Sequence, residues 1–150
     1  MNEIDRIQDQ LRRAFEGEAW HGPAVKEVLA GIDARVAAAR PIAQAHSIWE
    51  ITHHIAAWEG IVAARVRGTK VEVTTEVDWP PVGETSEAAW QRSLASLESG
   101  HAALADAIGL LEESRLSETI GPKRSLYGLL HGVIQHYLYH AGQIAIFRKA

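Results

Sequence analysis

Apolar residues recur at helical spacing in four long stretches of the chain, and charged or turn-forming residues separate these stretches. Positions three, four and seven apart share one face of an α-helix, so this period predicts amphipathic helices that bury their apolar faces. Shorter helical segments are expected at 23–30 and 33–39. The predicted long helices cover residues 2–16, 47–67, 86–111 and 125–149. An all-α four-helix bundle follows from this pattern.

Residues that start and stop helices lie at the edges of these stretches. Ser47 is followed three residues later by Glu50, which is the arrangement of a capping box, and Gly68 follows the end of the same stretch. Ser125 is expected to cap the last helix, because a serine hydroxyl accepts hydrogen bonds from the free amides of a first turn. Capping residues and apolar period therefore predict the same boundaries.

Composition excludes several classes of function. The 150 residues predict one domain, 1–150, and its formal net charge of −4 without a basic tract argues against a nucleic-acid partner. The chain has no cysteine, which excludes disulfides, thiolate metal ligands and a cysteine nucleophile. The pattern indicates neither a signal peptide nor a membrane span, so we expect a cytoplasmic protein without a membrane partner.

Histidines interrupt the apolar faces of the second and fourth long helices. His136 and His140 are four residues apart, so their side chains lie one above the other on one helix face. His140 falls near the middle of the apolar stripe, and His136 falls on its flank. On the second helix, His54 lies at the edge of the stripe, whereas the adjacent His53 points almost directly away from it.

Imidazoles buried in a bundle core need polar partners. Three imidazoles from two helices are typical of a divalent metal site that keeps a position for water or substrate. We therefore predict one metal ion per chain, held by His54, His136 and His140. Zn²⁺, Ni²⁺, Fe²⁺ and Mn²⁺ remain possible, because imidazole does not select one of them. The alternative is that these are core histidines bonded to neighbouring groups or water.

The depths of the histidines along their helices predict the order of the bundle. His54 lies about 11 Å from the start of its helix, and His136 and His140 lie about 14–20 Å from the end of theirs. These depths match best if the two helices are antiparallel, which gives an up-down-down-up order. Residues 69–84 must then cross the length of the bundle as a loop between the second and third helices, and an extended segment of this length reaches up to ~50 Å.

Several segments carry a resemblance to a known family. The segment LLHGVIQHYLYHAGQIAIFRKA resembles the C-terminal signature of the DinB/YfiT-like family of small metal-binding four-helix proteins. The segment SIWEITHHIAAWEG is similar to the second-helix motif of that family, in which a histidine followed by an aliphatic residue is the third ligand. FEGEAWHGP and DWPP resemble segments of one subgroup, so the resemblance spans nearly the whole chain.

The resemblance implies the up-down-down-up bundle, a divalent metal on His54, His136 and His140, and a homodimer. Some relatives are thiol-dependent S-transferases or isomerases that use bacillithiol, mycothiol or glutathione, and many have no known reaction. Relatives often carry Asp directly after the first histidine of the C-terminal pair, where this chain has Tyr137. If that Asp orients a ligand or transfers protons in the relatives, this chain has either lost that role or carries it on another residue.

Further polar residues are candidates for proton transfer or for bonding a metal-bound water. His21 and His46 are expected in connections at the end of the bundle assigned to the site, either as proton shuttles or as solvated loop residues. Glu59 is a candidate base at the far edge of its apolar stripe, with an exposed charge as the ordinary alternative. Tyr139 and Gln143 flank the second histidine of the pair, as partners of a bound water or as surface residues.

The pattern also suggests surfaces that contact other molecules. The outer face of the second helix is small and apolar, which favours a homodimer through Trp49, Ala56, Gly60 and Ala63. Three tryptophans either line the entrance to the site, for an apolar or thiol substrate, or pack in the core. They are Trp20, Trp58 and Trp79. Surface or interface positions are expected for His53, His101 and His131.

Two classes of function remain. The first is an enzyme in which a low-molecular-weight thiol binds the metal of an open site and attacks an electrophile, with metal-assisted hydrolysis as a variant. The second is a non-enzymatic, stress-linked protein that binds a metal or a small ligand. An open coordination position and a pocket between Trp20–Pro23 and Trp79–Pro81 would favour the enzyme, to which the family resemblance also points. A filled metal shell without a pocket would favour the binding protein.

Overall fold

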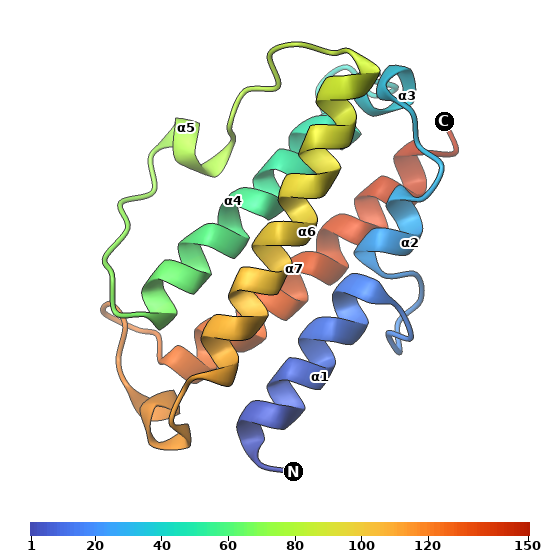
Figure 1. The fold of residues 1–150 in the computed structure, drawn as a ribbon. Helices are drawn as coiled ribbons and strands as arrows, with labels where there is room; N and C mark the ends of the chain where they lie inside the picture. The colour runs from blue at the N-terminus through green and yellow to red at the C-terminus, as the bar shows by residue number, and fades with distance from the viewer.

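The four long helices of the computed structural model, which describes residues 1–150, pack side by side as a bundle without any β-sheet (Figure 1). They are α1 (Glu3–Glu16), α4 (Ile48–Val66), α6 (Glu87–Gly109) and α7 (Leu126–Phe147). The connections contain α2 (Val25–Leu29), α3 (Ala34–Ala38), α5 (Thr75–Asp78) and the 3₁₀ helix η1 (Glu113–Ser117). The predicted all-α fold is confirmed, and each predicted limit of a long helix lies within one or two residues of the observed one.

Side-chain caps set the starts of the long helices. In α4, the amide of Glu50 donates to Ser47 Oγ at 3.1 Å, and the amide of Ser47 donates to Glu50 Oε2 at 2.7 Å. This reciprocal pair is the predicted capping box, and it satisfies two donors that the first turn leaves free. In α7, Ser125 Oγ accepts from the amide of Gly128 at 3.1 Å, as expected. None of the helices has the length and hydropathy that a membrane span requires.

Helices α4 and α6 run in one direction, and α1 and α7 run in the other (Figure 1). Contacts between α4 and α6 agree with this arrangement. Near their starts, the rings of Trp49 and Trp90 meet edge-on with centres 5.1 Å apart, and near their ends Arg67 donates to the carbonyl of Ala103 at 3.3 Å. This is the up-down-down-up order.

The long segment between α4 and α6 crosses back along the outside of α4 (Figure 1). The sequence predicted a loop for this segment, and the structure adds that α5 forms one helical turn within it. Thr74 caps this turn by accepting from the amide of Val77 at 3.3 Å. A single turn is too short for an apolar period, so the pattern did not predict it. The turn places Asp78 and Trp79 against α4.

The core is built from the apolar faces of all four long helices, and it includes the predicted stripe of α4. The face of α4 expected to form a dimer contact is in part buried, and Trp49 on it packs against Trp90 and Ser93 of α6. Trp49 is 1% exposed and Ala63 is 3% exposed, although Gly60 is exposed. Because α4 packs against both α6 and α7, it needs two buried faces. The prediction of a free outer surface was therefore wrong for Trp49 and Ala63, whereas Gly60 is exposed and Ala56 is half-buried.

Candidate metal centre

Three histidines meet between the antiparallel helices α4 and α7. The Nε2 atoms of His54 and His136 lie 2.9 Å apart, and Nε2 of His140 lies 3.1 Å from Nε2 of His136. One ring nitrogen from each residue lies within 4.8 Å of the other two. His54 and His140 are buried and His136 is half-buried. The fold thus brings together the three residues that the sequence selected.

The outer ring nitrogens of two of these histidines are held by the protein. His54 Nδ1 lies 2.6 Å from the backbone oxygen of Asp78, and His140 Nδ1 lies 2.7 Å from Oε1 of Gln143. Since a carbonyl oxygen can only accept, each Nδ1 carries the hydrogen. The Nε2 atoms of both rings therefore present lone pairs toward the centre of the group.

Hydrogen bonds among the three rings cannot satisfy all of these nitrogens. The lone pairs of His54 and His140 both point at Nε2 of His136, which has at most one hydrogen to donate. The outer nitrogen of His136, Nδ1, is buried without a hydrogen-bond partner. A cation among the three Nε2 atoms would accept all three lone pairs at once.

A proton does not fill this position at neutral pH. Burial lowers the pKa of His54, and it lowers the pKa of His136 to about 3 and that of His140 to about 4. The neighbouring imidazoles depress the pKa of His136 further. All three rings are therefore neutral at pH 7. Neutral imidazole is the form that binds a divalent metal ion, so the chemistry of these donors fits such an ion.

Aromatic rings cover the group on the side of α5. Trp79 stacks on His54 with ring centres 3.9 Å apart, and His46 stacks on Trp79 at 3.6 Å. Trp58 donates from Nε1 to Asp78 Oδ1 at 2.7 Å. The last turn of α5 is thereby fixed to α4, which holds the Asp78 carbonyl against His54.

Four further residues that the sequence suggested for the site are exposed. Tyr139 is 66% exposed, with its ring 5.1 Å from that of His140. His21 is exposed in the connection between α1 and α2. Trp20 is also fully exposed, so it does not wall a pocket as expected. His46 is exposed, as expected for a loop residue, although one face of its ring stacks on Trp79.

Glu59 is completely buried, so the expectation of an exposed charge was wrong. It accepts a hydrogen bond from the hydroxyl of Tyr137 at 2.7 Å, and its Oε2 lies against Gly100 without a partner. The Tyr137 hydroxyl also lies 3.1 Å from Nδ1 of the buried His101, which stacks on Phe15. Burial raises the pKa of Glu59 to about 8 and lowers the pKa of His101 to about 4.

Sequence reasoning missed this network of Glu59, Tyr137 and His101. His101 was expected at a surface or interface, and the structure places it in the core because α6 packs against both α1 and α4. His53 is half-buried at the contact of α4 with α6, where its Nε2 lies 2.8 Å from Ser93 Oγ. Gly100, next to His101 in α6, was the available signal for this network. Glycine has no side chain, so at the contact of two helices it leaves room for a carboxylate from the facing helix.

A family model described as the DinB superfamily matches residues 19–144. No curated protein and no solved structure matches the chain significantly. The matched range contains His54, His136 and His140 together with the network of Glu59, Tyr137 and His101.

Proposed function

Because the chain belongs to the DinB superfamily, we propose that His54, His136 and His140 bind one divalent metal ion and that the protein is a metal-dependent enzyme with a low-molecular-weight thiol as cosubstrate. The observation that supports this is the convergence of three neutral imidazoles on one centre. When bound, such an ion acts as a Lewis acid that lowers the pKa of a coordinated thiol or water.

The residues around the three histidines hold them ready for the ion. The carbonyl of Asp78 and the amide oxygen of Gln143 fix the hydrogen on Nδ1 of His54 and His140, which sets the tautomer and raises the basicity of each Nε2. Trp79 covers one face of the His54 ring and excludes water from it. These contacts orient the ligands before any ion arrives.

The protein supplies three ligands, and no carboxylate joins them. Three protein ligands with an open position are the arrangement of catalytic sites, whereas structural sites are closed by four. The chain has no cysteine, so a sulfur nucleophile has to arrive on a cosubstrate. In the transfer, the thiol sulfur forms a bond to an electrophilic carbon, the leaving group departs with its electron pair, and the thiol proton passes to solvent.

Two alternatives use the same residues. Metal-assisted hydrolysis would place water where the thiol binds. A non-enzymatic protein that binds a metal or small ligand is favoured by the coverage of the group, since His54 is 6% exposed and His140 is 5% exposed. The homodimer stays a prediction from the family resemblance.

A panel of thiols with a chromogenic electrophile tests the proposal. The panel contains glutathione, bacillithiol and mycothiol, and it is run on the metal-loaded protein, on His54→Ala and on the control His131→Ala, which alters another half-buried histidine of α7. We expect turnover with at least one thiol in the unmodified protein and the control, and none in His54→Ala. Equal turnover in the unmodified protein and both variants would contradict the proposal. Absence of turnover with every thiol, and with ester and amide substrates, would also contradict it and favour the non-enzymatic binding protein.

A further inference from the structure

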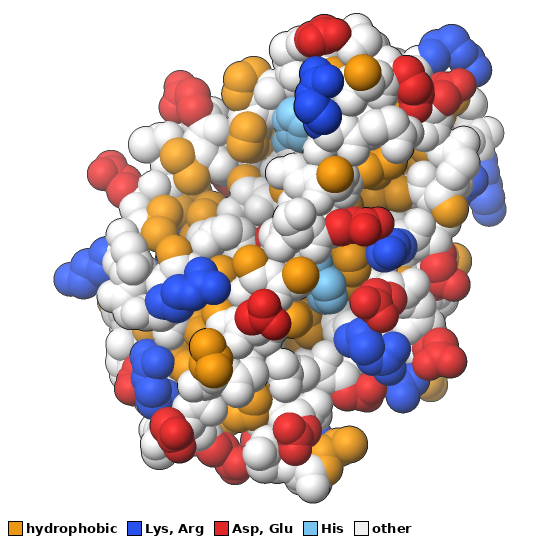
Figure 2. All heavy atoms as spheres, viewed as in Figure 1, with side chains coloured by type: hydrophobic (Ala, Val, Ile, Leu, Met, Phe, Trp, Pro, Cys, Tyr) orange, Lys and Arg blue, Asp and Glu red, His pale blue; other side chains and the backbone are white.

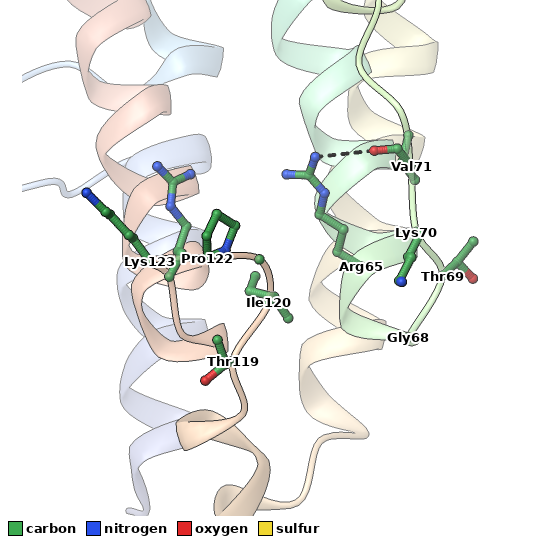
Figure 3. Close-up of a pocket in the computed structure, with 11 residues that line it drawn as sticks. Arg65, Gly68, Thr69, Lys70, Val71, Thr119, Ile120, Pro122 and Lys123 are labelled. Atoms are coloured by element: carbon green, nitrogen blue, oxygen red, sulfur yellow. Dashed lines mark hydrogen bonds between the residues drawn. The ribbon is translucent and has the colours of Figure 1, made fainter.

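A hollow of about 670 Å³ lies where α4 ends and α7 begins. One wall is the last turn of α4 with residues 68–71, and the other is the loop of residues 119–124 that precedes α7 (Figure 3). Arg65 reaches from α4 into the space between these walls in this view. We refer to this hollow as the basic cavity.

The charges around the basic cavity all have one sign. No acidic residue lines it, and its cationic residues are Arg65, Lys70, Lys123 and Arg124. None of these four forms an ion pair, although the chain as a whole has a net charge of −4. On the face that Figure 2 shows, Lys and Arg side chains are interspersed with Asp and Glu, whereas the lining of the basic cavity has cations alone. Such a cluster attracts small anions.

Arg65 is the fixed member of the cluster. It is half-buried, and its Cζ lies 5.7 Å from the ring centre of Trp58, which holds the guanidinium in place by a cation–π contact. Nη2 makes one long hydrogen bond of 3.5 Å to the carbonyl of Val71 (Figure 3). The other N–H groups are free for a carboxylate or phosphate, whose oxygens match the fork of the guanidinium. Lys70 and Gly121, one on each wall, have amides that donate to no backbone carbonyl.

Trp58 lies near both Arg65 of the basic cavity and His136 of the metal centre. Its ring centre lies 5.7 Å from Cζ of Arg65 and 5.9 Å from the ring centre of His136. The guanidinium therefore cannot be farther from that imidazole than these two distances together. The two sites are therefore close enough for one small molecule to place an anionic group at Arg65 and its thiol at the histidines.

We propose that the basic cavity binds the carboxylate or phosphate groups of a small anionic molecule and, resting on the function proposed above, that this molecule is the thiol cosubstrate. The substrate class is then a low-molecular-weight thiol that carries two or more anionic groups. A thiol without a negative charge would react at the metal centre without the affinity that the basic cavity supplies.

Anion binding to the metal-free protein tests the basic cavity by itself. Citrate and inorganic phosphate are titrated at low ionic strength into the unmodified protein and into Lys70→Gln/Lys123→Gln, which alters exposed side chains only. The control Arg35→Gln/Lys149→Gln removes the same charge from exposed cations elsewhere on the chain. We expect the first double variant to bind at least one of the two anions about tenfold more weakly and the control to match the unmodified protein. Absent binding, or equal loss in both variants, would overturn the proposal.

Kinetics separate this inference from the proposed function. Lys70→Gln/Lys123→Gln should raise KM for a carboxylate-bearing thiol and leave kcat and the KM of uncharged 2-mercaptoethanol unchanged. His54→Ala should lose turnover but still bind the same anion as the unmodified protein. If no thiol is turned over while anion binding depends on the two lysines, the anion site stands and its link to a thiol is wrong. If KM rises equally for both thiols, the basic cavity does not bind the cosubstrate.

Discussion

The indole of Trp79 stacks on the imidazole of His54 with ring centres 3.9 Å apart and ring planes 6° apart. The residue before it, Asp78, holds the edge of the same histidine, because its backbone carbonyl accepts from Nδ1 at 2.6 Å. The crossover between α4 and α6 therefore orients a ligand of the candidate metal centre at two points. The order of the bundle and the geometry of the site depend on the same segment.

Removing the stack should weaken metal binding without removing a ligand. Trp79→Leu leaves the Asp78 carbonyl in place but frees one face of the His54 ring, and partners of this kind typically contribute about 10–100-fold to affinity. We expect a loss of about tenfold in Zn²⁺ affinity, measured by competition with a chromophoric chelator. Trp20→Leu is the matched control because Trp20 is fully exposed. Equal affinities in the two variants would show that the stack does not orient His54.

Gln143 should act as a positioning residue for His140. Its Oε1 accepts from Nδ1 at 2.7 Å, so Gln143→Leu removes the acceptor that fixes the tautomer. We expect about tenfold weaker metal binding in this variant. Gln143→Glu retains an acceptor oxygen and should restore binding. A glutamate variant as weak as the leucine variant would count against this role.

The buried Glu59 makes stability depend on pH. Burial raises its pKa to about 8 from 4.5, so between these values the folded protein keeps a proton that the unfolded chain releases. The free energy of unfolding therefore falls as pH rises through this range. Buried histidines with lowered pKa values act in the opposite direction, but only below about pH 6.5, where an unfolded histidine titrates. Between pH 6.5 and 8, the metal-free protein should lose about 1–2 kcal/mol.

Urea unfolding of the metal-free protein across this pH range measures the effect. Glu59→Gln retains an acceptor for the Tyr137 hydroxyl and has no proton to lose, so its free energy of unfolding should stay level between pH 6.5 and 8. The exposed Glu76 provides the control, because Glu76→Gln should keep the decline. A decline of the same size in Glu59→Gln would assign the pH dependence to another group.

Gly100 should be required by the carboxylate of Glu59. A Cβ at this position would overlap Glu59 Oε2, whereas a Cβ on the exposed Gly60 of α4 would meet no atom within 4 Å. We expect Gly100→Ala to destabilise the protein by about 1–3 kcal/mol. Gly60→Ala should stabilise it by about 0.5–1 kcal/mol, since alanine favours a helix interior. Thermal unfolding that gives both variants the same shift would contradict the packing described here.

The parts of the fold that follow from local chemistry were predictable from the sequence. Ser47 and Ser125 start their helices as expected, and the spacing of His136 and His140 placed them on one face opposite His54. Contacts made by a helix with two neighbours were not predictable, because an amphipathic pattern identifies only one buried face. This is why His101, expected at a surface or interface, and Glu59, for which an exposed charge was the ordinary alternative, both lie in the core.

Metal binding by the protein without an affinity tag tests the central claim most directly. The protein is stripped with a chelator and titrated with Zn²⁺, Ni²⁺, Mn²⁺ and Fe²⁺, and the bound metal is measured by elemental analysis. The same measurement is made on His140→Ala and on His131→Ala, which alters a histidine of α7 outside the group. We predict one ion per chain in the unmodified protein and in His131→Ala, and none in His140→Ala. Absence of binding with every metal, or equal binding to His140→Ala, would contradict the assignment of His54, His136 and His140 as a metal centre.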